Sequence, residues 1–247
     1  MSISQNSTPS SIPNSTENST KLLYLSDTYL FEANAQIVDI FQHESQTILV
    51  LDQTIFYPAG GGQPSDVGFI SNQNGKFEVV KTIFNPNGQV WHIGNFVSGI
   101  LSVGESVKLE IDKEKRLLNS KNHTAGHLID LAIESLNLAF IPVKGYHFPV
   151  GAYVEYSGNL DLDNAKFAEM LEQKVNEIIT QNPKISFEMT NTKHESGKVE
   201  RIMHIENYKS CPCGGTHIAQ TSEIGKIKIR KVKNNKGNIR ISYELFK

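Results

Sequence analysis

Two pairs of potential metal ligands, far apart in the sequence, constrain the fold of this chain more than any other feature. His123 and His127 form the first pair, and Cys213 and His217 form the second. Each pair is spaced i, i+4, and on a helix that spacing places two side chains on one face. Three imidazoles and one thiolate make a tetrahedral ligand set suited to zinc. If the pairs meet, distant segments of the chain fold around one metal ion in a cleft.

The first pair lies in a stretch with helical periodicity. We expect Asp112 to cap the start of a helix that continues to about Leu138. In zinc proteases with a His-Glu-x-x-His helix, the Glu is the general base. Thr124 stands at that position here. The helix therefore offers metal ligands without the protease base, which argues against peptide hydrolysis.

The second pair brackets two glycines, Gly214 and Gly215. Glycines let the backbone fold back so that both ligands face one point, and their amides are candidate hydrogen-bond donors beside the metal. The alternative is an ordinary Gly-Gly turn without a ligand. Cys211 is another possible ligand, but we favour Cys213 because its spacing to His217 matches that of the histidine pair. Two further histidines are interpreted as surface residues: His194 and His204.

The composition is that of an ordinary globular chain. Its 247 residues are 38% hydrophobic and 20% charged, which is enough for one large domain or two small ones. The two cysteines are separated by one residue, so they cannot staple a fold, and nothing indicates an oxidising compartment. No apolar run approaches the roughly 20 residues that span a bilayer, and no secretory signal is recognisable. We expect a cytoplasmic protein without a membrane partner.

Three regions follow from the distribution of residue types. Residues 1–20 are rich in Ser, Asn and Thr and are expected to form a disordered tail. Residues 21–111 contain short β-branched segments separated by turns, which predicts a small β-barrel. Residues 112–247 predict a second, α+β domain. The expected strands are 36–40, 47–51, 77–80, 107–111, 139–143, 152–156, 185–189, 224–232 and 238–246, and the expected helices are 112–138 and 163–179.

A triple glycine, Gly60-Gly61-Gly62, lies beside aromatic residues in the barrel region and is followed by Gln63. Such a loop can approach a partner closely and present its amides to phosphate or sugar. A hairpin loop without a ligand is the alternative.

A net charge of -2 gives no global sign of a polyanionic partner, so a nucleic-acid role needs a local basic patch. Basic residues cluster near the end of the chain, where alternate strand positions would line one face. The alternative is a solvated sheet edge protected by lysines. The cluster comprises Lys226, Lys228, Arg230, Lys231, Lys233, Lys236 and Arg240.

The Gly-rich loop, the His-Thr-Ala-Gly-His helix and the Pro-Cys-Gly-Gly-Thr-His segment occur in an order that resembles the editing domains of alanyl-tRNA synthetases and the AlaX trans-editing proteins. The resemblance extends from about Leu23 to Lys247. Its most specific parts are residues 52–58 followed by the glycines, and residues 213–217 followed by Glu223-Ile224-Gly225. No aminoacylation domain is recognisable, so the chain is similar to the medium-length AlaX form.

The resemblance implies an α+β fold: an N-terminal small β-barrel, then an α+β sandwich editing domain of the type called the second additional domain of threonyl- and alanyl-tRNA synthetases. It also implies one zinc ion and a zinc-dependent aminoacyl-tRNA deacylase. The reaction would be hydrolysis in trans of the ester in Ser-tRNA(Ala), and in some cases Gly-tRNA(Ala), which aids translational fidelity. The partner would be the acceptor end of alanine tRNA. The implied zinc ligands are His123, His127, Cys213 and His217.

By the same resemblance, the loop residues Gly61, Gly62 and Gln63 would contribute to tRNA recognition. Many editing domains carry a Gln-Lys-Gly-Ser-like segment beside the amino-acid pocket, and here residues 143–146 are Val-Lys-Gly-Tyr. Lys144 and Gly145 match and are expected to bind substrate. Val143 replaces a polar residue, and Tyr146 and His147 reshape the pocket, so the amino-acid preference stays open. No general base is identifiable, and Thr216 is a candidate catalytic donor.

Two other functions remain open at this point. A non-catalytic tRNA-binding module with structural zinc would also have four protein ligands. The second open function is a deacylase for a different mischarged tRNA, since threonyl-tRNA synthetases share a related domain. The sequence is compatible with a monomer but does not define the oligomeric state.

Overall fold

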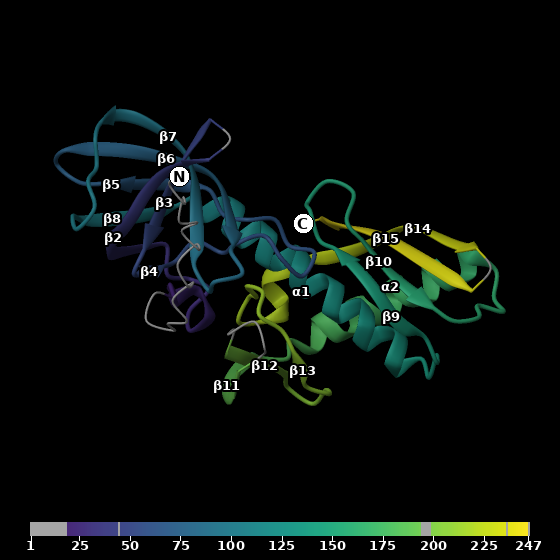
Figure 1. Cartoon of the computed structure of the whole chain (residues 1–247). Helices are drawn as coiled ribbons and strands as arrows, with labels where there is room; N and C mark the ends of the chain where they lie inside the picture. Colours follow the sequence, from purple (N-terminus) through teal and green to yellow (C-terminus); the bar gives the residue numbers. More distant parts are fainter. Residues whose placement is uncertain (1–18, 44, 194–198, 236, 247) are drawn as a thin grey trace, which may run out of the picture.

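The computed structural model describes residues 19–43, 45–193, 199–235 and 237–246. In this part of the chain a closed barrel is followed by an α+β unit with two long helices, which confirms the expected fold class (Figure 1). The expected disordered tail comprised residues 1–20, and residues 1–18 lie outside the described part of the chain. Thr20 is buried, and its hydroxyl donates a 2.9 Å hydrogen bond to the Leu51 carbonyl.

The barrel has six strands in the order β2-β3-β7-β6-β5-β8. Its strands alternate buried and exposed side chains, as in β8, because successive residues of a strand face opposite sides of a sheet. Leu49, Phe77 and Leu109 are among the residues that fill its core. The sequence did not predict β5 and β7. The bounds are β2 (Glu32–His43), β3 (Gln46–Leu51), β5 (Gly68–Ser71), β6 (Gly75–Phe84), β7 (Val90–Gly99) and β8 (Ser106–Ile111).

A short segment precedes the barrel and packs against it. Strand β1 (Lys21–Leu22) pairs in parallel with β4 (Gln53–Thr54), and a 3-10 turn, η2 (Leu23–Leu25), follows β1. Tyr24 from this turn packs edge-on against Tyr57, which precedes the Gly-rich loop. This contact places the start of the described chain beside that loop.

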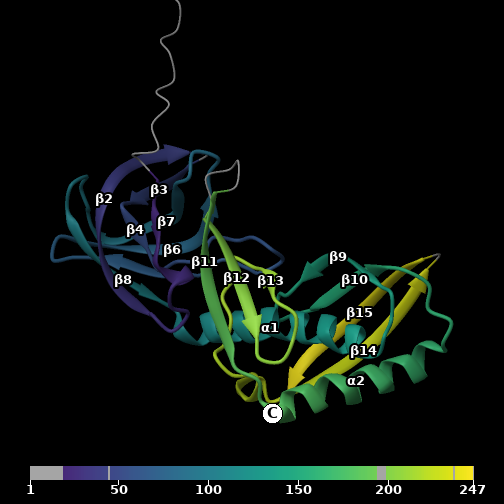
Figure 2. The same cartoon turned by 90° about the horizontal axis from the view of Figure 1, so that it is seen from below.

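The α+β unit is built on a four-stranded sheet in the order β14-β15-β10-β9. Asp112 caps the first helix through a 3.0 Å hydrogen bond from the Lys115 amide, as expected. One face of the sheet packs with both helices into the second core, and α2 runs alongside β14 and β15 (Figure 2). Neither helix is long and apolar enough to cross a bilayer. The elements are α1 (Lys113–Ser135), β9 (Ile141–Tyr146), β10 (Tyr153–Ser157), α2 (Asn164–Gln181), β14 (Lys226–Asn235) and β15 (Asn238–Phe246).

A third sheet carries the second ligand pair toward the first helix. Its strands are β11 (Ile185–Lys193), β12 (Val199–Ile205) and β13 (Cys211–Pro212), in that order. The sequence predicted only the start of β11. Cys213 follows β13 directly, and a second 3-10 turn, η3 (Thr221–Ile224), leads from this region into β14.

A buried ion pair joins α1 to the barrel. The Arg116 guanidinium and the Asp66 carboxylate are almost fully buried, and Arg116 also donates to the carbonyls of Thr28 and Ile55. Asp66 in turn accepts a 2.7 Å hydrogen bond from the Tyr57 amide. Because breaking such a pair leaves a buried charge uncompensated, it fixes the start of α1 against the segment that contains the Gly-rich loop.

Candidate metal centre

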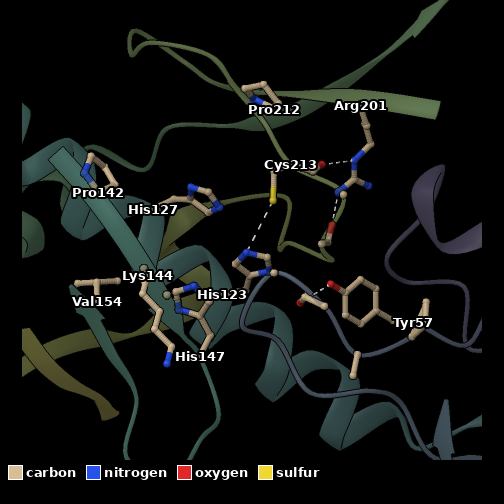
Figure 3. Close-up of a pocket in the computed structure, with 18 of the residues that line it drawn as sticks. Tyr57, His123, His127, Pro142, Lys144, His147, Val154, Arg201, Pro212 and Cys213 are labelled. Atoms are coloured by element: carbon tan, nitrogen blue, oxygen red, sulfur yellow. Dashed lines mark hydrogen bonds between the residues drawn. The ribbon is translucent and has the colours of Figure 1, made fainter. Parts of the chain in front are cut away.

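The structure brings the two ligand pairs together. One ligand atom from each of His123, His127, Cys213 and His217 lies within 4.8 Å of the others. The Cys213 sulfur is 3.1 Å from Nε2 of His217 and 3.7 Å from Nε2 of His123, and Figure 3 shows it facing His123. The histidine pair lies on α1, but residues 213–217 are irregular coil. The side chains of Cys213 and His217 therefore converge because the loop between them folds back, and not because they share a helix face.

Hydrogen bonds fix the tautomers of two histidines. Nδ1 of His123 lies 2.8 Å from Oε1 of Gln63, which can only accept, so Nδ1 donates. Nδ1 of His217 lies 3.1 Å from the hydroxyl of Thr124, which already donates to the carbonyl of Ser120. A neutral imidazole with its proton on Nδ1 presents a lone pair at Nε2. Both Nε2 atoms therefore meet the Cys213 sulfur as potential ligands.

His127 supplies the test of whether the site fits a metal. Its Nε2 is buried and has no hydrogen-bond partner among the described residues. Its Nδ1 lies 3.9 Å from the Asp130 carboxylate and 3.8 Å from the Cys211 sulfur. A buried nitrogen without a partner is costly, and coordination to a cation would satisfy it. Cys211 lies beside Nδ1 of the His127 ring, not beside Nε2, and is outside the set of converging ligand atoms.

Burial sets the protonation of these groups. It lowers the pKa of His127 to about 4 and the pKa values of His123 and His217 well below their usual range, so all three are neutral near pH 7. It raises the pKa of the Cys213 thiol, whereas the Gly215 amide and Arg201 lower it. Neutral imidazoles and a thiolate are the ligand forms that zinc requires, and a bound cation favours that thiolate.

Close packing beside the metal centre requires a residue without a side chain at two positions. A Cβ on Gly215 would lie 2.1 Å from Cε1 of His123, and a Cβ on Gly62 would lie 2.3 Å from the Gly145 carbonyl oxygen. A Cβ on Gly214 would meet no atom within 4 Å. The two glycines of the Cys213–His217 loop therefore have different roles.

Gln63 and Thr216 lie behind His123 and are buried. Oε1 of Gln63 accepts from His123 and, at 3.0 Å, from the Thr216 amide, while Nε2 donates to the Thr216 hydroxyl at 2.8 Å. That hydroxyl also lies 2.7 Å from the Ser120 hydroxyl. Gln63 was expected to bind substrate and Thr216 to donate in catalysis. In this structure their hydrogen bonds connect them to each other and to His123.

Arg201, on β12, was missed by the sequence analysis. Its guanidinium donates to the carbonyls of Cys213, at 3.0 Å, and Gly215, and reaches the Leu25 carbonyl at 2.9 Å. It is 2% exposed and lies over the Phe187 ring. Arg201 therefore holds the loop that carries the thiol. No motif surrounds this arginine in the sequence, so only the fold reveals its role.

A cleft of about 580 Å³ opens beside the metal centre. Of the potential ligands, His123, His127 and Cys213 line it, and Gly61, Lys144 and Gly145 lie along its wall, whereas Gly62, Gln63 and Thr216 do not. His147 also lines it (Figure 3). Its ring stacks on that of His123 with centroids 4.7 Å apart.

The tautomer of His147 follows from its partners. Its Nδ1 lies 2.7 Å from the Tyr243 hydroxyl, and that hydroxyl donates to the Asn122 carbonyl at 2.8 Å. Nδ1 therefore donates to Tyr243, and Nε2 is left as a hydrogen-bond acceptor. Burial lowers the pKa of His147 to about 4, which keeps the ring neutral.

Comparison with known proteins finds two family models that match parts of this chain. Residues 6–115 match the family of class II (A) tRNA synthetases, and residues 201–242 match the second additional domain of threonyl and alanyl tRNA synthetases. The chain is 35% identical to the alanyl-tRNA editing protein AlaX-L of Pyrococcus horikoshii, over 90% of this chain and 57% of that protein. It is 31% identical to an alanine–tRNA ligase of Clostridioides difficile, over 78% of this chain and 23% of the ligase.

An alanine–tRNA ligase of Streptococcus agalactiae is 35% identical over 83% of this chain and 26% of the ligase. The chain thus spans little more than half of the AlaX-L protein and about a quarter of the ligases. On these alignments, which take in both the barrel and the metal-centre segments, the chain is similar to an alanyl-tRNA editing protein and to part of the alanine–tRNA ligases.

Proposed function

We propose that this protein is a zinc-dependent deacylase that hydrolyses the ester between a wrongly attached amino acid and alanine tRNA. Serine is the expected amino acid, with glycine as a second substrate. One observation carries the proposal: three of the four potential ligands, His123, His127 and Cys213, line an open cleft. A structural zinc site is closed, whereas a catalytic one is accessible to substrate.

The chemistry demands little of the protein. An aminoacyl ester is already activated, so positioning of a water molecule and stabilisation of the oxyanion supply much of the rate enhancement. Zinc held by His123, His127, Cys213 and His217 would supply Lewis acidity at the cleft. The remaining steps fall to groups of the protein that face the same cleft.

We assign roles to two such groups. Gly214 lines the cleft, and because the Gly215 amide bonds the Cys213 sulfur, we assign the Gly214 amide as the donor for the developing oxyanion. His147 presents an acceptor at Nε2, because Tyr243 holds its other nitrogen, and we assign it to orienting the attacking water. Lys144, exposed on the wall of the cleft, would contact the phosphate of the terminal nucleotide.

Amino-acid release from purified mischarged tRNAs tests the proposal. Zinc-loaded protein should release serine from Ser-tRNA(Ala) and leave Ala-tRNA(Ala) intact. His123→Ala should abolish release, because it removes a ligand that lines the cleft. His204→Ala is the matched control: His204 lies on β12, away from the metal centre, and bonds Ser210.

The outcomes separate the alternatives. Undiminished serine release by His123→Ala without zinc would refute the metal assignment. Binding of tRNA without release of any amino acid would identify a non-catalytic module. Release confined to a different mischarged tRNA would redirect the assignment to that tRNA.

A further inference from the structure

The four-stranded sheet of the α+β unit has one face that no helix covers. Its inner face carries Val154, Ile241 and Val232, which are buried in the core. Residues directly opposite each other in neighbouring strands share a face. The strand register therefore places two cross-strand rows on the outer face, and none of their members is buried. The rows are Tyr146, Tyr153, Ser242 and Lys231, and Lys144, Glu155, Arg240 and Lys233.

Aromatic rings stack along this outer face. Phe148 stacks on Tyr146 with centroids 4.4 Å apart and planes 12° apart, and Tyr146 stacks on Tyr153 at 5.2 Å and 15°. The Arg240 guanidinium lies 4.1 Å from the centre of the Tyr153 ring and continues the stack. None of the three rings belongs to a hydrophobic core cluster of the described residues. We call this set the aromatic ladder.

The ladder has one open end. Tyr146 and Tyr153 have planar groups on both sides, but Phe148 contacts a single described ring, that of Tyr146. A nucleic-acid base can stack on a free aromatic face whatever its identity, because every base has a π-face. The open end at Phe148 therefore has the form of a platform for an unpaired base.

The same face is positively charged. Lys144, Lys231 and Lys233 are exposed and form no ion pair with described residues, whereas Arg240 is paired with Glu155 at 2.6 Å. These lysines give the face a local positive charge in a chain whose net charge is -2. Lys236, which the sequence analysis placed in the basic cluster, lies outside the described residues. A basic face interleaved with aromatic rings is the combination that binds single-stranded nucleic acid.

The outer face and the cleft meet at the edge of the sheet. β9 is the edge strand, and its Lys144 belongs both to a row of the outer face and to the wall of the cleft. Glu155, the neighbour of Lys144 on β10, also lines the cleft. A strand of RNA lying on the outer face can therefore enter the cleft by crossing β9.

We propose that the unpaired 3′ end of an RNA lies on this face, with a base stacked on Phe148 and its phosphates on Lys144, Lys231 and Lys233. The inference rests on the proposed function, since it names the surface that delivers the tRNA end to the cleft. It also accounts for Tyr146, which stands at the Ser position of the Gln-Lys-Gly-Ser-like pattern, since this residue belongs to the ladder.

Binding of RNA without an attached amino acid tests the proposal. The probes are a fluorescent single-stranded RNA of about ten nucleotides and a blunt-ended RNA hairpin, each followed by fluorescence anisotropy. Phe148→Leu should weaken single-strand binding about tenfold, because one base loses its stacking partner. Phe148→Trp should retain binding. Lys233→Gln should reduce the slope of log affinity against log salt by about one.

The matched control is Phe69→Leu. Phe69 is a half-buried ring on β5 of the barrel, with the Lys76 ammonium 3.9 Å from its centre, so it offers a ring and a cation outside the ladder. Its replacement should leave RNA binding unchanged. Thermal unfolding of each variant verifies that the fold is retained.

Three results would overturn the inference. The first is that Phe148→Leu binds single-stranded RNA as tightly as wild type. The second is that Phe69→Leu loses as much affinity as Phe148→Leu. The third is that the blunt hairpin binds as tightly as the single strand and responds in the same way to Phe148→Leu and Lys233→Gln. These probes contain no ester, so the result does not depend on hydrolysis. A protein that binds through the ladder but releases no amino acid would refute the deacylase assignment alone.

Discussion

Nδ1 of His123 donates a 2.8 Å hydrogen bond to Oε1 of Gln63, which lies 60 residues earlier in the chain. His123 belongs to α1 of the α+β unit, and Gln63 belongs to the Gly-rich loop that follows the first barrel strands. The loop thus supports the metal centre from outside the ligand set. Partners of this kind fix the orientation and tautomer of a ligating histidine.

Replacement of Gln63 tests this support. We expect Gln63→Leu to lower zinc affinity by about 10- to 100-fold, the usual effect of losing a partner of a ligating histidine. Gln63→Glu should lose less zinc affinity than Gln63→Leu, because a carboxylate oxygen at this position still accepts the hydrogen bond from Nδ1 of His123. Competition with a chelator measures the affinity. Gln173→Leu, at a residue of α2 that bonds Glu177 on the surface, is the control. Equal affinities for wild type and Gln63→Leu would contradict this role.

The two adjacent glycines of the Cys213–His217 loop should respond differently to the same substitution. Gly215→Ala places a Cβ 2.1 Å from the His123 ring, so we expect displacement of His123 and loss of zinc. Gly214→Ala meets no atom within 4 Å and should retain the metal. Metal content after purification compares them. Equal zinc content in both variants would show that His123 tolerates the shift.

Thr124 stands where zinc proteases have their general base, yet in this structure its hydroxyl accepts from His217 and donates to the Ser120 carbonyl. Thr124→Val removes this hydroxyl with little change in volume, so we expect zinc affinity to fall about tenfold or more. Thr124→Ser keeps a hydroxyl and should stay close to wild type. Chelator competition measures the zinc affinity of both variants. Equal zinc affinities for wild type and Thr124→Val would show that the Thr124 hydroxyl does not stabilise the metal centre.

His92 should make the stability of the barrel depend on pH. It is buried, bonded to Thr54 and to the Leu49 carbonyl, and burial lowers its pKa from 6.5 to about 4. The unfolded chain therefore binds a proton on this residue between pH 6.5 and 4 that the folded chain excludes. The contribution of His92 to the unfolding free energy is complete above pH 6.5. It should fall by up to about 3 kcal/mol as pH decreases to 4.

Urea unfolding at a series of pH values measures this effect in wild type and His92→Gln. The other histidines contribute to both proteins, so the difference between the two slopes isolates His92. Parallel slopes would show that His92 titrates alike in the folded and unfolded states.

Local patterns in the sequence predicted the elements that position the site. The Asp112 cap and the apolar periodicity located α1, and β-branched runs located β14 and β15, within a few residues of their observed bounds. The sequence did not predict strands β5, β7, β12 and β13, nor the two-residue strands β1 and β4. β13 has two residues, too few for a pattern, and β12 carries Arg201, whose charge is satisfied by carbonyls of other segments.

The metal ligands were predictable because their identity and spacing are local, and the structure brings all four together. The orientation of Gln63 and Thr216 was not predictable. Each bonds a residue distant in sequence, and a glutamine beside three glycines has the same sequence pattern whether it faces a ligand or a histidine. The ladder was hidden for the same reason, since Tyr153 and Arg240 meet Tyr146 only through strand register.

The Arg116–Asp66 pair has a consequence for any attempt to divide this protein. A fragment that starts at Asp112 would keep the guanidinium and lose its carboxylate, and a fragment that ends there would be left with the opposite charge. Each half would then carry one charged group, the Arg116 guanidinium or the Asp66 carboxylate, without the partner that compensates it in the buried pair. Proteolytic separation at this junction should therefore yield two unstable pieces rather than two independent modules.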